Sequence, residues 1–304
     1  MKNNKKHKIR PIIITMYLKG GLGNQMFQYA FGRTIADKRS RDLFLDTSEL
    51  EHVHPGITPR HYSLSSFNVR ALTGHGAFEI GRLKLLILKK IPWLQKKLSI
   101  GLESDQGFQS RFAHDDSIDF FHGYWQSHHY FTSNANQIFQ DFTPKKSLSN
   151  QALNLLYKIN SSNSVMIHVR RGDYISSAVA ASYHASLNID YYKSAYNALC
   201  QQVEKPSFFI FSDDIVWCES ALSFINHPVE FIAPDLMPAD WEDLIVMSHC
   251  KHHIIANSSF SWWSAWLADQ RHGLDNRFVY APLKWFVKDS IDPRDRFPYH
   301  WKLL

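Results

Sequence analysis

The sequence predicts an α/β protein that contains a doubly wound parallel sheet. In the second half of the chain, short apolar runs alternate with segments of helical periodicity, a pattern typical of parallel strands joined by helical crossovers. The first half opens with a similar unit, in which an apolar run leads through a glycine turn into an amphipathic helix. The 304 residues, 44% of them hydrophobic, are enough for two domains with cores of their own.

The first half begins with a predicted strand at residues 12–18, the glycine turn Gly20-Gly21-Leu22-Gly23 and a helix that starts near Asn24. Hydrophobic and small residues recur along one face of this helix, at Phe27, Ala30, Phe31, Thr34 and Ile35. A short strand is expected at 42–45. From about residue 49 to 142 the periodicity weakens, which predicts loops and short helices that shape a pocket.

The second half is more regular. Five apolar runs predict strands at residues 165–169, 208–211, 229–232, 254–256 and 278–280. Helical segments separate them at residues 191–202, 216–224, 241–249 and 259–267. The polar run at 144–147 is a plausible junction, so we expect domains at residues 1–145 and 146–304, with a C-terminal tail that can return to the first domain.

Composition narrows the function only in part. The formal net charge of +6 suits an anionic ligand, nucleic acid or an acidic membrane surface equally well. The three cysteines, Cys200, Cys218 and Cys250, form no CxxC pair, which argues against a disulfide framework or a thiolate metal site and favours a cytoplasmic setting. The apolar run after the basic N-terminus is too short for a signal sequence or a membrane span.

One segment has two interpretations that the sequence leaves open. From Gly81 to Leu102, leucines and isoleucines alternate with lysines and arginines around Trp93. This pattern predicts either peripheral contact with the inner face of the cytoplasmic membrane, or a surface helix that packs its leucines inward.

Three polar clusters each follow the end of a predicted strand. They are HVRRGDY at residues 168–174, Ser212-Asp213-Asp214, and Asn257-Ser258-Ser259 followed by Phe260. Open parallel sheets bind ligands along the edge where their strands end, so we expect the three clusters to form one site.

In HVRRGDY, strand alternation puts His168 and Arg170 on one face and Arg171 on the other. A guanidinium is a planar fork of donors that can hold two phosphate oxygens. We therefore expect one arginine to bind a diphosphate and the other to pair with a carboxylate such as Asp173.

The other two clusters each have a binding and a structural interpretation. Ser212, Asp213 and Asp214 can accept from a ribose hydroxyl or from guanine, or can cap the helix that follows. The helix after Asn257 offers its N-terminal N–H groups as a second phosphate site, and the same residues are ordinary caps. Three tryptophans in that helix are expected in the core: Trp262, Trp263 and Trp266.

The glycine turn is a weaker signal. Gly21 and Gly23 allow a ligand close to the backbone, and Asn24 and Gln25 offer side-chain amides, but a tight strand-to-helix turn explains the glycines equally well.

Taken in order, GGLGNQMFQYA from Gly20, GYWQS from Gly123, HVRRGDY, FSDD and NSSFSWW resemble the motifs of bacterial α-1,2-fucosyltransferases of glycosyltransferase family 11. The resemblance implies a GT-B-like pair of Rossmann-type domains facing a cleft. It also implies GDP-fucose as donor, inversion at the anomeric carbon and no required metal or other cofactor, and the sequence contains no Asp-Xaa-Asp pair.

The resemblance also assigns roles to residues. It implies that Arg170 binds the diphosphate with His168 beside the donor, and that Asp213 or Asp214 binds guanosine. Asn257, Ser258 and Ser259 correspond to the turn that receives phosphate, and Asn24 to an asparagine near the sugar. Related O-fucosyltransferases have an arginine at the position of Gly21, so that part of their mechanism does not carry over.

The expected reaction needs a base and an acceptor site. Asp173 and His168 are the nearest candidate bases by motif, although Asp173 is equally suited to pair with Arg171 and a base in the first half remains an alternative. The expected acceptor is a galactose-terminated oligosaccharide or lipid-linked glycan of a surface polysaccharide. Its wall is expected to include Tyr124, Trp125, His128 and His129, which are as often core residues.

Three rival functions remain at this point. The basic balance allows a nucleic-acid-binding protein, but that function leaves the polar clusters at the strand ends unexplained, so we expect no nucleic acid partner. A non-catalytic carbohydrate-binding module does not need 304 residues or a diphosphate site. A fucosyltransferase of another linkage is the third, because HVRRGDY alone does not define the α-1,2 linkage.

Overall fold

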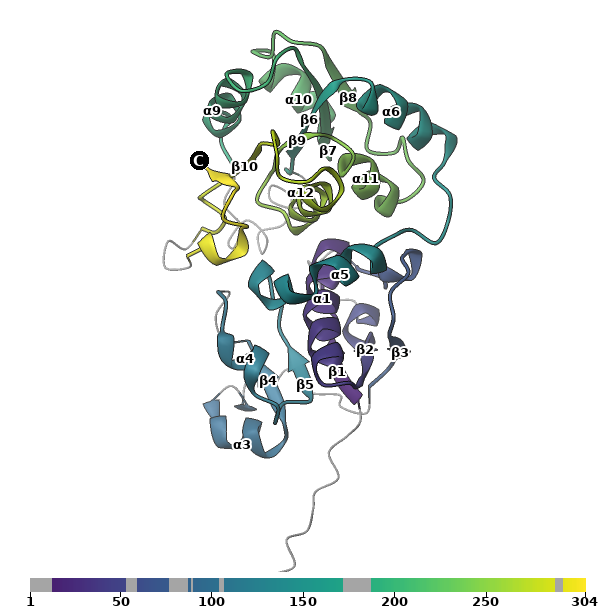
Figure 1. The fold of residues 1–304 in the computed structure, drawn as a ribbon, viewed down its shortest axis with the longest axis vertical. Helices are drawn as coiled ribbons and strands as arrows, with labels where there is room; N and C mark the ends of the chain where they lie inside the picture. The colour runs from purple at the N-terminus through teal and green to yellow at the C-terminus, as the bar shows by residue number, and fades with distance from the viewer. Residues whose placement is uncertain are drawn as a thin grey trace, which may run out of the picture.

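The computed structural model describes residues 13–52, 59–76, 87–88, 90–103, 107–171, 187–287 and 292–304. It contains two parallel sheets, each with helices packed on it, stacked one above the other in Figure 1. The predicted α/β class is confirmed.

The N-terminal sheet has the strand order β3-β2-β1-β5-β4, with every described pair parallel. Its strands are β1 (Ile13–Tyr17), β2 (Asp42–Asp46), β3 (Leu72–Gly74), β4 (Ile100–Leu102) and β5 (Phe120–His122). Its helices are α1 (Leu22–Lys38), α3 (Pro92–Lys97), α4 (Ser110–His114) and α5 (Ala135–Asp141), with short 3₁₀ turns η1 (Ser48–Glu51), η2 (Leu64–Ser66), η3 (His128–Tyr130) and η4 (Thr132–Asn134). The prediction of only loops and short helices after residue 49 was wrong, because β3, β4 and β5 are three-residue strands, too short to show alternation.

The C-terminal sheet has the order β11-β10-β9-β6-β7-β8, again with parallel pairs. Its strands are β6 (Asn163–Val169), β7 (Pro206–Ser212), β8 (Val229–Ile232), β9 (His252–Ile254), β10 (Val279–Ala281) and β11 (Lys302–Leu303). Its helices are α6 (Asn150–Asn160), α9 (Ile189–Cys200), α10 (Ile215–Ala221), α11 (Asp240–Met247) and α12 (Ser259–His272), with the 3₁₀ turn η5 (Arg294–Arg296). The five predicted strands are present, although β9 starts earlier than expected, whereas α6 and β11 were not predicted.

The carboxyl ends of the two sheets face each other. Helix α1 starts where β1 ends, and α12 starts just beyond β9. The two helix starts are in contact, because a Cβ added to Gly23 would lie 2.6 Å from the carbonyl carbon of Ser259. This arrangement of two Rossmann-type domains about facing strand ends is a GT-B fold, as expected.

The contact between α1 and α12 is a hydrophobic core shared by both domains. Trp262 and Trp263 are fully buried, and their rings lie 4.5 and 5.0 Å from that of Phe27. The indole of Trp263 donates to the carbonyl of Gly23 at 2.9 Å, across the domain boundary. The prediction that these tryptophans are core residues is confirmed.

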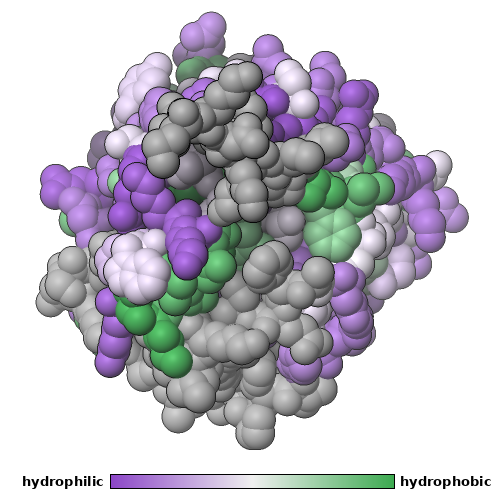
Figure 2. Space-filling model, turned by 90° about the horizontal axis from the view of Figure 1, so that it is seen from below, coloured by the Kyte–Doolittle hydropathy of each residue, from purple (hydrophilic) through white to green (hydrophobic). Residues whose placement is uncertain are grey.

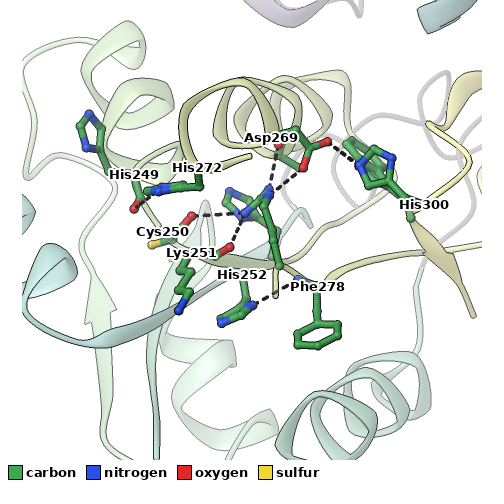
Figure 3. A network of polar contacts seen from close by, with 12 residues as sticks. His249, Cys250, Lys251, His252, Asp269, His272, Phe278 and His300 are labelled. Atoms are coloured by element: carbon green, nitrogen blue, oxygen red, sulfur yellow. Dashed lines mark hydrogen bonds and ion pairs between the residues drawn. The ribbon is translucent and has the colours of Figure 1, made fainter. Parts of the chain in front are cut away.

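A buried polar network joins the C-terminal tail to the end of α12 (Figure 3). The Asp269 carboxylate accepts from Arg277 Nε at 2.6 Å, from His300 Nε2 at 3.0 Å and from Trp301 Nε1 at 2.8 Å. Burial raises the pKa of Asp269, but these donors and the charge of Arg277 outweigh it, so the pKa lies below its ordinary value. Asp269 is therefore the ionised centre of the network.

Helix α3 lies at the end of the N-terminal domain away from the second sheet (Figure 1). Around it, Ile87, Trp93 and Leu98 are 48%, 67% and 41% exposed, and hydrophobic side chains gather beside hydrophilic ones on the face that Figure 2 shows. No helix in the described part of the chain is long and apolar enough to cross a membrane.

Candidate active site

The end of β6 brings the HVRRGDY motif to the facing edge. His168 is 6% exposed, and its Nδ1 has no hydrogen-bond partner among the described residues. Burial, with a further contribution from the charge of Arg170, lowers the pKa of His168 to about 3. The imidazole is therefore neutral at neutral pH, and its low pKa makes it a weak base.

Both arginines of the motif pair with carboxylates from the end of β7. Arg170 Nη1 lies 2.9 Å from Asp213 Oδ2, and Arg171 Nε lies 3.1 Å from Asp214 Oδ2. The Arg171 guanidinium also covers the ring of Trp217 at 3.9 Å, and its backbone N–H donates to Asp213 at 2.8 Å. Asp173, the partner expected for one arginine, lies outside the described residues.

The Ser212-Asp213-Asp214 cluster combines capping and charge pairing. Asp214 caps α10 by accepting from the Trp217 N–H at 3.1 Å, and Ser212 Oγ accepts from the Asp214 N–H at 3.0 Å. Asp213 does not cap the helix and instead pairs with Arg170. The carboxylate expected at guanosine is thus linked to the arginine expected at the diphosphate.

Across the sheet, the NSSF turn leads into α12. Ser258 caps the helix by accepting from the Phe260 N–H at 3.3 Å, while Asn257 is buried and donates to the Trp285 carbonyl at 3.1 Å. The Phe260 ring lies 6.1 Å from that of His168, and Ser259 is partly exposed. The N-terminus of α12 therefore lies beside the His168 side of the motif.

The glycine turn after β1 lies on the N-terminal side of the facing strand ends. Gly20 has φ +80°, and an added Cβ would lie 2.4 Å from Asn24 Nδ2, so a side chain there meets both strain and a clash. Gly21 lies against Arg60, whose guanidinium carbon would be 3.8 Å from a Cβ at that position. Gln25 is buried, and its side-chain Nε2 donates a hydrogen bond to the carbonyl of His61 at 2.8 Å.

The expected acceptor residues occupy different environments. Trp125 is fully buried in an aromatic cluster, which favours its core interpretation, while Tyr124 is partly exposed beneath Lys19 at 4.1 Å. His129 is exposed, and its ring lies against that of His128 in a tilted arrangement, with ring centroids 4.0 Å apart. Burial, with a contribution from His129, lowers the pKa of His128 to about 4.

One carboxylate at this edge was not predicted from the sequence. Glu103 follows β4 and accepts from the N–H groups of Tyr124 and Trp125 at 2.6 and 3.0 Å. Burial raises the pKa of Glu103, although these N–H groups and the charge of Lys19 oppose the rise. Gly123 fits only because it has no side chain, since an added Cβ would lie 2.5 Å from Glu103 Cβ. A three-residue strand gave no signal for Glu103.

Two further residues at this edge were also not predicted. Gln126 lies inside GYWQS, and Arg296 comes from η5 near the C-terminus, 170 residues away. Gln126 belongs to a motif but had no role assigned to it, and no local pattern distinguishes Arg296 from a surface side chain.

The sequence matches the family model described as Glycosyl transferase family 11 over residues 102–273. A curated relative, the alpha-1,2-colitosyltransferase of Escherichia coli, is 32% identical over 302 residues, which cover 95% of this chain and 98% of the relative. The chain belongs to glycosyltransferase family 11. The O-antigen biosynthesis glycosyltransferase WbnK of Escherichia coli is 30% identical over 293 residues, covering 90% of this chain and 95% of WbnK.

A solved structure has the same fold. A mutant of FUT1 from Arabidopsis thaliana in complex with GDP superposes with a TM-score of 0.51 and 11% identity, covering 92% of this chain and 72% of that one. Further curated relatives at 24 to 25% identity are named galactoside fucosyltransferases. Membership of family 11 makes this protein a glycosyltransferase rather than a nucleic-acid-binding protein or a non-catalytic module.

Proposed function

We propose that this glycosyltransferase transfers L-fucose from GDP-fucose to the 2-hydroxyl of a galactose-terminated glycan, forming an α-1,2 linkage. The observation that carries the proposal is the arrangement at the facing strand ends. Arg170 follows β6, and the N-termini of α1 and α12 meet at Gly23 and Ser259. Phe260 of α12 lies 6.1 Å, ring to ring, from His168 of β6. Guanidinium and helix N-terminal N–H groups both favour phosphate oxygens, so this arrangement suits the diphosphate of a sugar nucleotide.

The proposed reaction is an in-line displacement. The acceptor hydroxyl oxygen attacks fucose C1, the bond from C1 to the diphosphate oxygen breaks, and GDP leaves with the electron pair, so the β-linked donor gives an α-linked product. The hydroxyl proton passes to a base, for which Asp173 stays a proposal. With its pKa of about 3, His168 is better suited to orient the donor than to hold that proton.

The leaving group gains negative charge as it departs. Arg170 and the two helix N-termini supply positive potential to it, so we propose that no divalent metal is required. Among the described residues, no group of three or more histidine, cysteine, aspartate or glutamate side chains is arranged to hold a metal ion. A transfer assay with EDTA tests this part of the proposal.

We assign the donor side of the cleft to residues 146–304 and the acceptor side to residues 1–145. On the acceptor side, the rings of Tyr124 and His128 are partly exposed and that of His129 is exposed, so all three are accessible to galactose. A lipid-linked O-antigen precursor at the inner face of the cytoplasmic membrane is the acceptor we favour.

Membrane contact through the stretch from Gly81 to Leu102 belongs to the same proposal. Trp93, Lys96 and Lys97 on α3 and Leu98 directly after it are all exposed, a combination that suits an anionic bilayer surface. Sedimentation with vesicles rich in phosphatidylglycerol is expected to carry down the protein at low salt, and equal recovery in the supernatant with and without vesicles would count against it.

Colitose is a second candidate donor sugar, because one relative is named a colitosyltransferase. Colitose is L-fucose without its 3-hydroxyl, so the same diphosphate site serves both. The deciding experiment incubates the protein with GDP-fucose or GDP-colitose and lactose in the presence of EDTA, followed by linkage analysis of the product. An α-1,2-fucosylated product is expected, and no transfer from either donor to any galactose-terminated glycan would overturn the proposal.

A further inference from the structure

Three polar side chains from distant segments form a hydrogen-bonded chain between the domains. Arg296 Nη1, in η5, donates to Gln126 Oε1 at 2.5 Å and to the Gln126 carbonyl at 3.2 Å. Gln126 Nε2, in the GYWQS segment, donates to Asn24 Oδ1 at 2.6 Å, in the first turn of α1. The chain of hydrogen bonds therefore ends at an asparagine in the first turn of α1, next to Gly23, which contacts the start of α12.

The chemistry of the three groups fixes the orientation of each amide. A guanidinium only donates, so the Gln126 atom that faces Arg296 must be the oxygen. Gln126 Nε2 then faces Asn24, and because an amide nitrogen only donates, the Asn24 atom that faces it must be Oδ1. Asn24 is left with Nδ2 directed away from Gln126, so it presents two N–H donors.

These donors lie beside the Gly20-Gly21 turn. Nδ2 occupies the position next to Gly20, where an added Cβ would come within 2.4 Å of it. Asn24 is partly exposed, and the adjacent Gly23 contacts Ser259 and Phe260 at the start of α12. The amide N–H groups thus add to those of the α1 and α12 N-termini, which the proposed function puts at the diphosphate of the donor.

Packing alone does not explain a buried arginine at position 296. It is 1% exposed, and burying a guanidinium costs several kcal/mol that an apolar side chain would avoid. Its charge is balanced by the ring of Phe286, 4.6 Å away, and by an electrostatic interaction with Glu103. A donor-only group at this place specifies the direction of the amides, which an apolar residue cannot do.

We propose that Arg296 and Gln126 are positioning residues that orient Asn24 to donate its amide N–H groups to an oxygen of the sugar nucleotide. This inference rests on the proposed function and adds two residues to it, one of them in the C-terminal tail. Asn24 is the residue that touches the ligand, and the other two act through it.

The test is Gln126→Glu, which keeps the size of the side chain but leaves no N–H to donate. The new carboxylate pairs with Arg296, and Asn24 turns so that Nδ2 donates to that carboxylate and Oδ1 faces the ligand. We expect kcat for transfer to fall roughly 10- to 100-fold, the range of one hydrogen bond to a charged group. The melting temperature is expected to stay the same or rise, because the variant gains an ion pair.

Gln109→Glu is the matched control. Gln109 also accepts from an arginine, Arg111 Nη2 at 3.0 Å, but does so on the exposed surface. This variant carries the same charge change and is expected to keep kcat within about twofold. A loss in both variants would mean that charge alone lowers activity, and would overturn the inference.

A double-mutant cycle separates orientation from structure. Asn24→Ala alone is expected to lower kcat, and adding Gln126→Glu to it is expected to change kcat little, since the amide to be oriented is gone. An undiminished effect of Gln126→Glu on the Asn24→Ala background contradicts the inference.

Calorimetric titration of the wild type and each variant with GDP distinguishes a failure of the proposed function from a failure of the positioning role. If the wild-type protein neither binds GDP nor transfers sugar, the proposed function fails. If the wild type does both and Gln126→Glu matches it in GDP binding and in kcat, only the positioning role fails.

Discussion

Arg170→Ala is expected to lower kcat for sugar transfer about 10³-fold, the loss typical of removing a group that stabilises charge in the transition state. The guanidinium lies at the end of β6, held in place by Asp213 at 2.9 Å. In the proposed reaction it faces the diphosphate as negative charge develops there. Arg170→Lys keeps the charge but loses the planar fork, so its kcat is expected to fall between those of the wild type and the alanine variant.

Arg171→Ala tests whether the loss of kcat is specific to Arg170. Arg171 covers Trp217 and pairs with Asp214, so its loss is expected to lower the melting temperature, and to lower kcat less than about tenfold. Initial rates with GDP-fucose, measured below the melting temperature of each variant, provide the test. Equal losses of kcat in the two variants would refute the division of roles between the arginines.

The proposed donor half of the site was accessible from the sequence because each of its main motifs follows an apolar strand. β6 and β7 are seven residues each, so the pattern of apolar residues is enough to place Arg170 and Asp213 on one edge of the sheet. The pairing itself was not accessible. Strand alternation separates Arg170 from Arg171, yet both reach carboxylates that follow β7, because adjacent parallel strands end in register at Val169 and Ser212.

The proposed acceptor half was less accessible from the sequence for a physical reason. Strands of three residues, such as β4, show no alternation, so nothing marked Glu103 as a residue at a strand end. The contact between Gln126 and Arg296 spans 170 residues and depends on how the tail returns past the cleft. Local sequence patterns predict strands, helices and the motifs that follow them. A tertiary hydrogen bond between two single polar residues leaves no periodicity in the sequence.

Asp269→Asn is expected to destabilise the protein by about 3 to 5 kcal/mol, because it leaves a buried charge without its partner. Arg277 and Asp269 each have side chains only 2% exposed, and the carboxylate also holds His300 and Trp301. The amide is nearly the same shape, so the loss comes from charge and hydrogen bonding rather than from a cavity. Urea unfolding followed by tryptophan fluorescence measures it.

Glu230→Gln is the control for Asp269→Asn. Its ion pair with Lys158, at 2.7 Å, has side chains 39% and 56% exposed, so we expect a loss below about 1 kcal/mol. If the free energy of unfolding falls equally in both variants, burial is not the reason that the Asp269 network stabilises the protein. Adding Arg277→Met to Asp269→Asn is expected to recover part of the stability, since no unpaired charge is then buried.

Asp269 also anchors Trp301, which follows Arg296 in the same tail. Asp269→Asn is therefore expected to weaken the orientation of Asn24 as well, and to lower kcat while the fold persists.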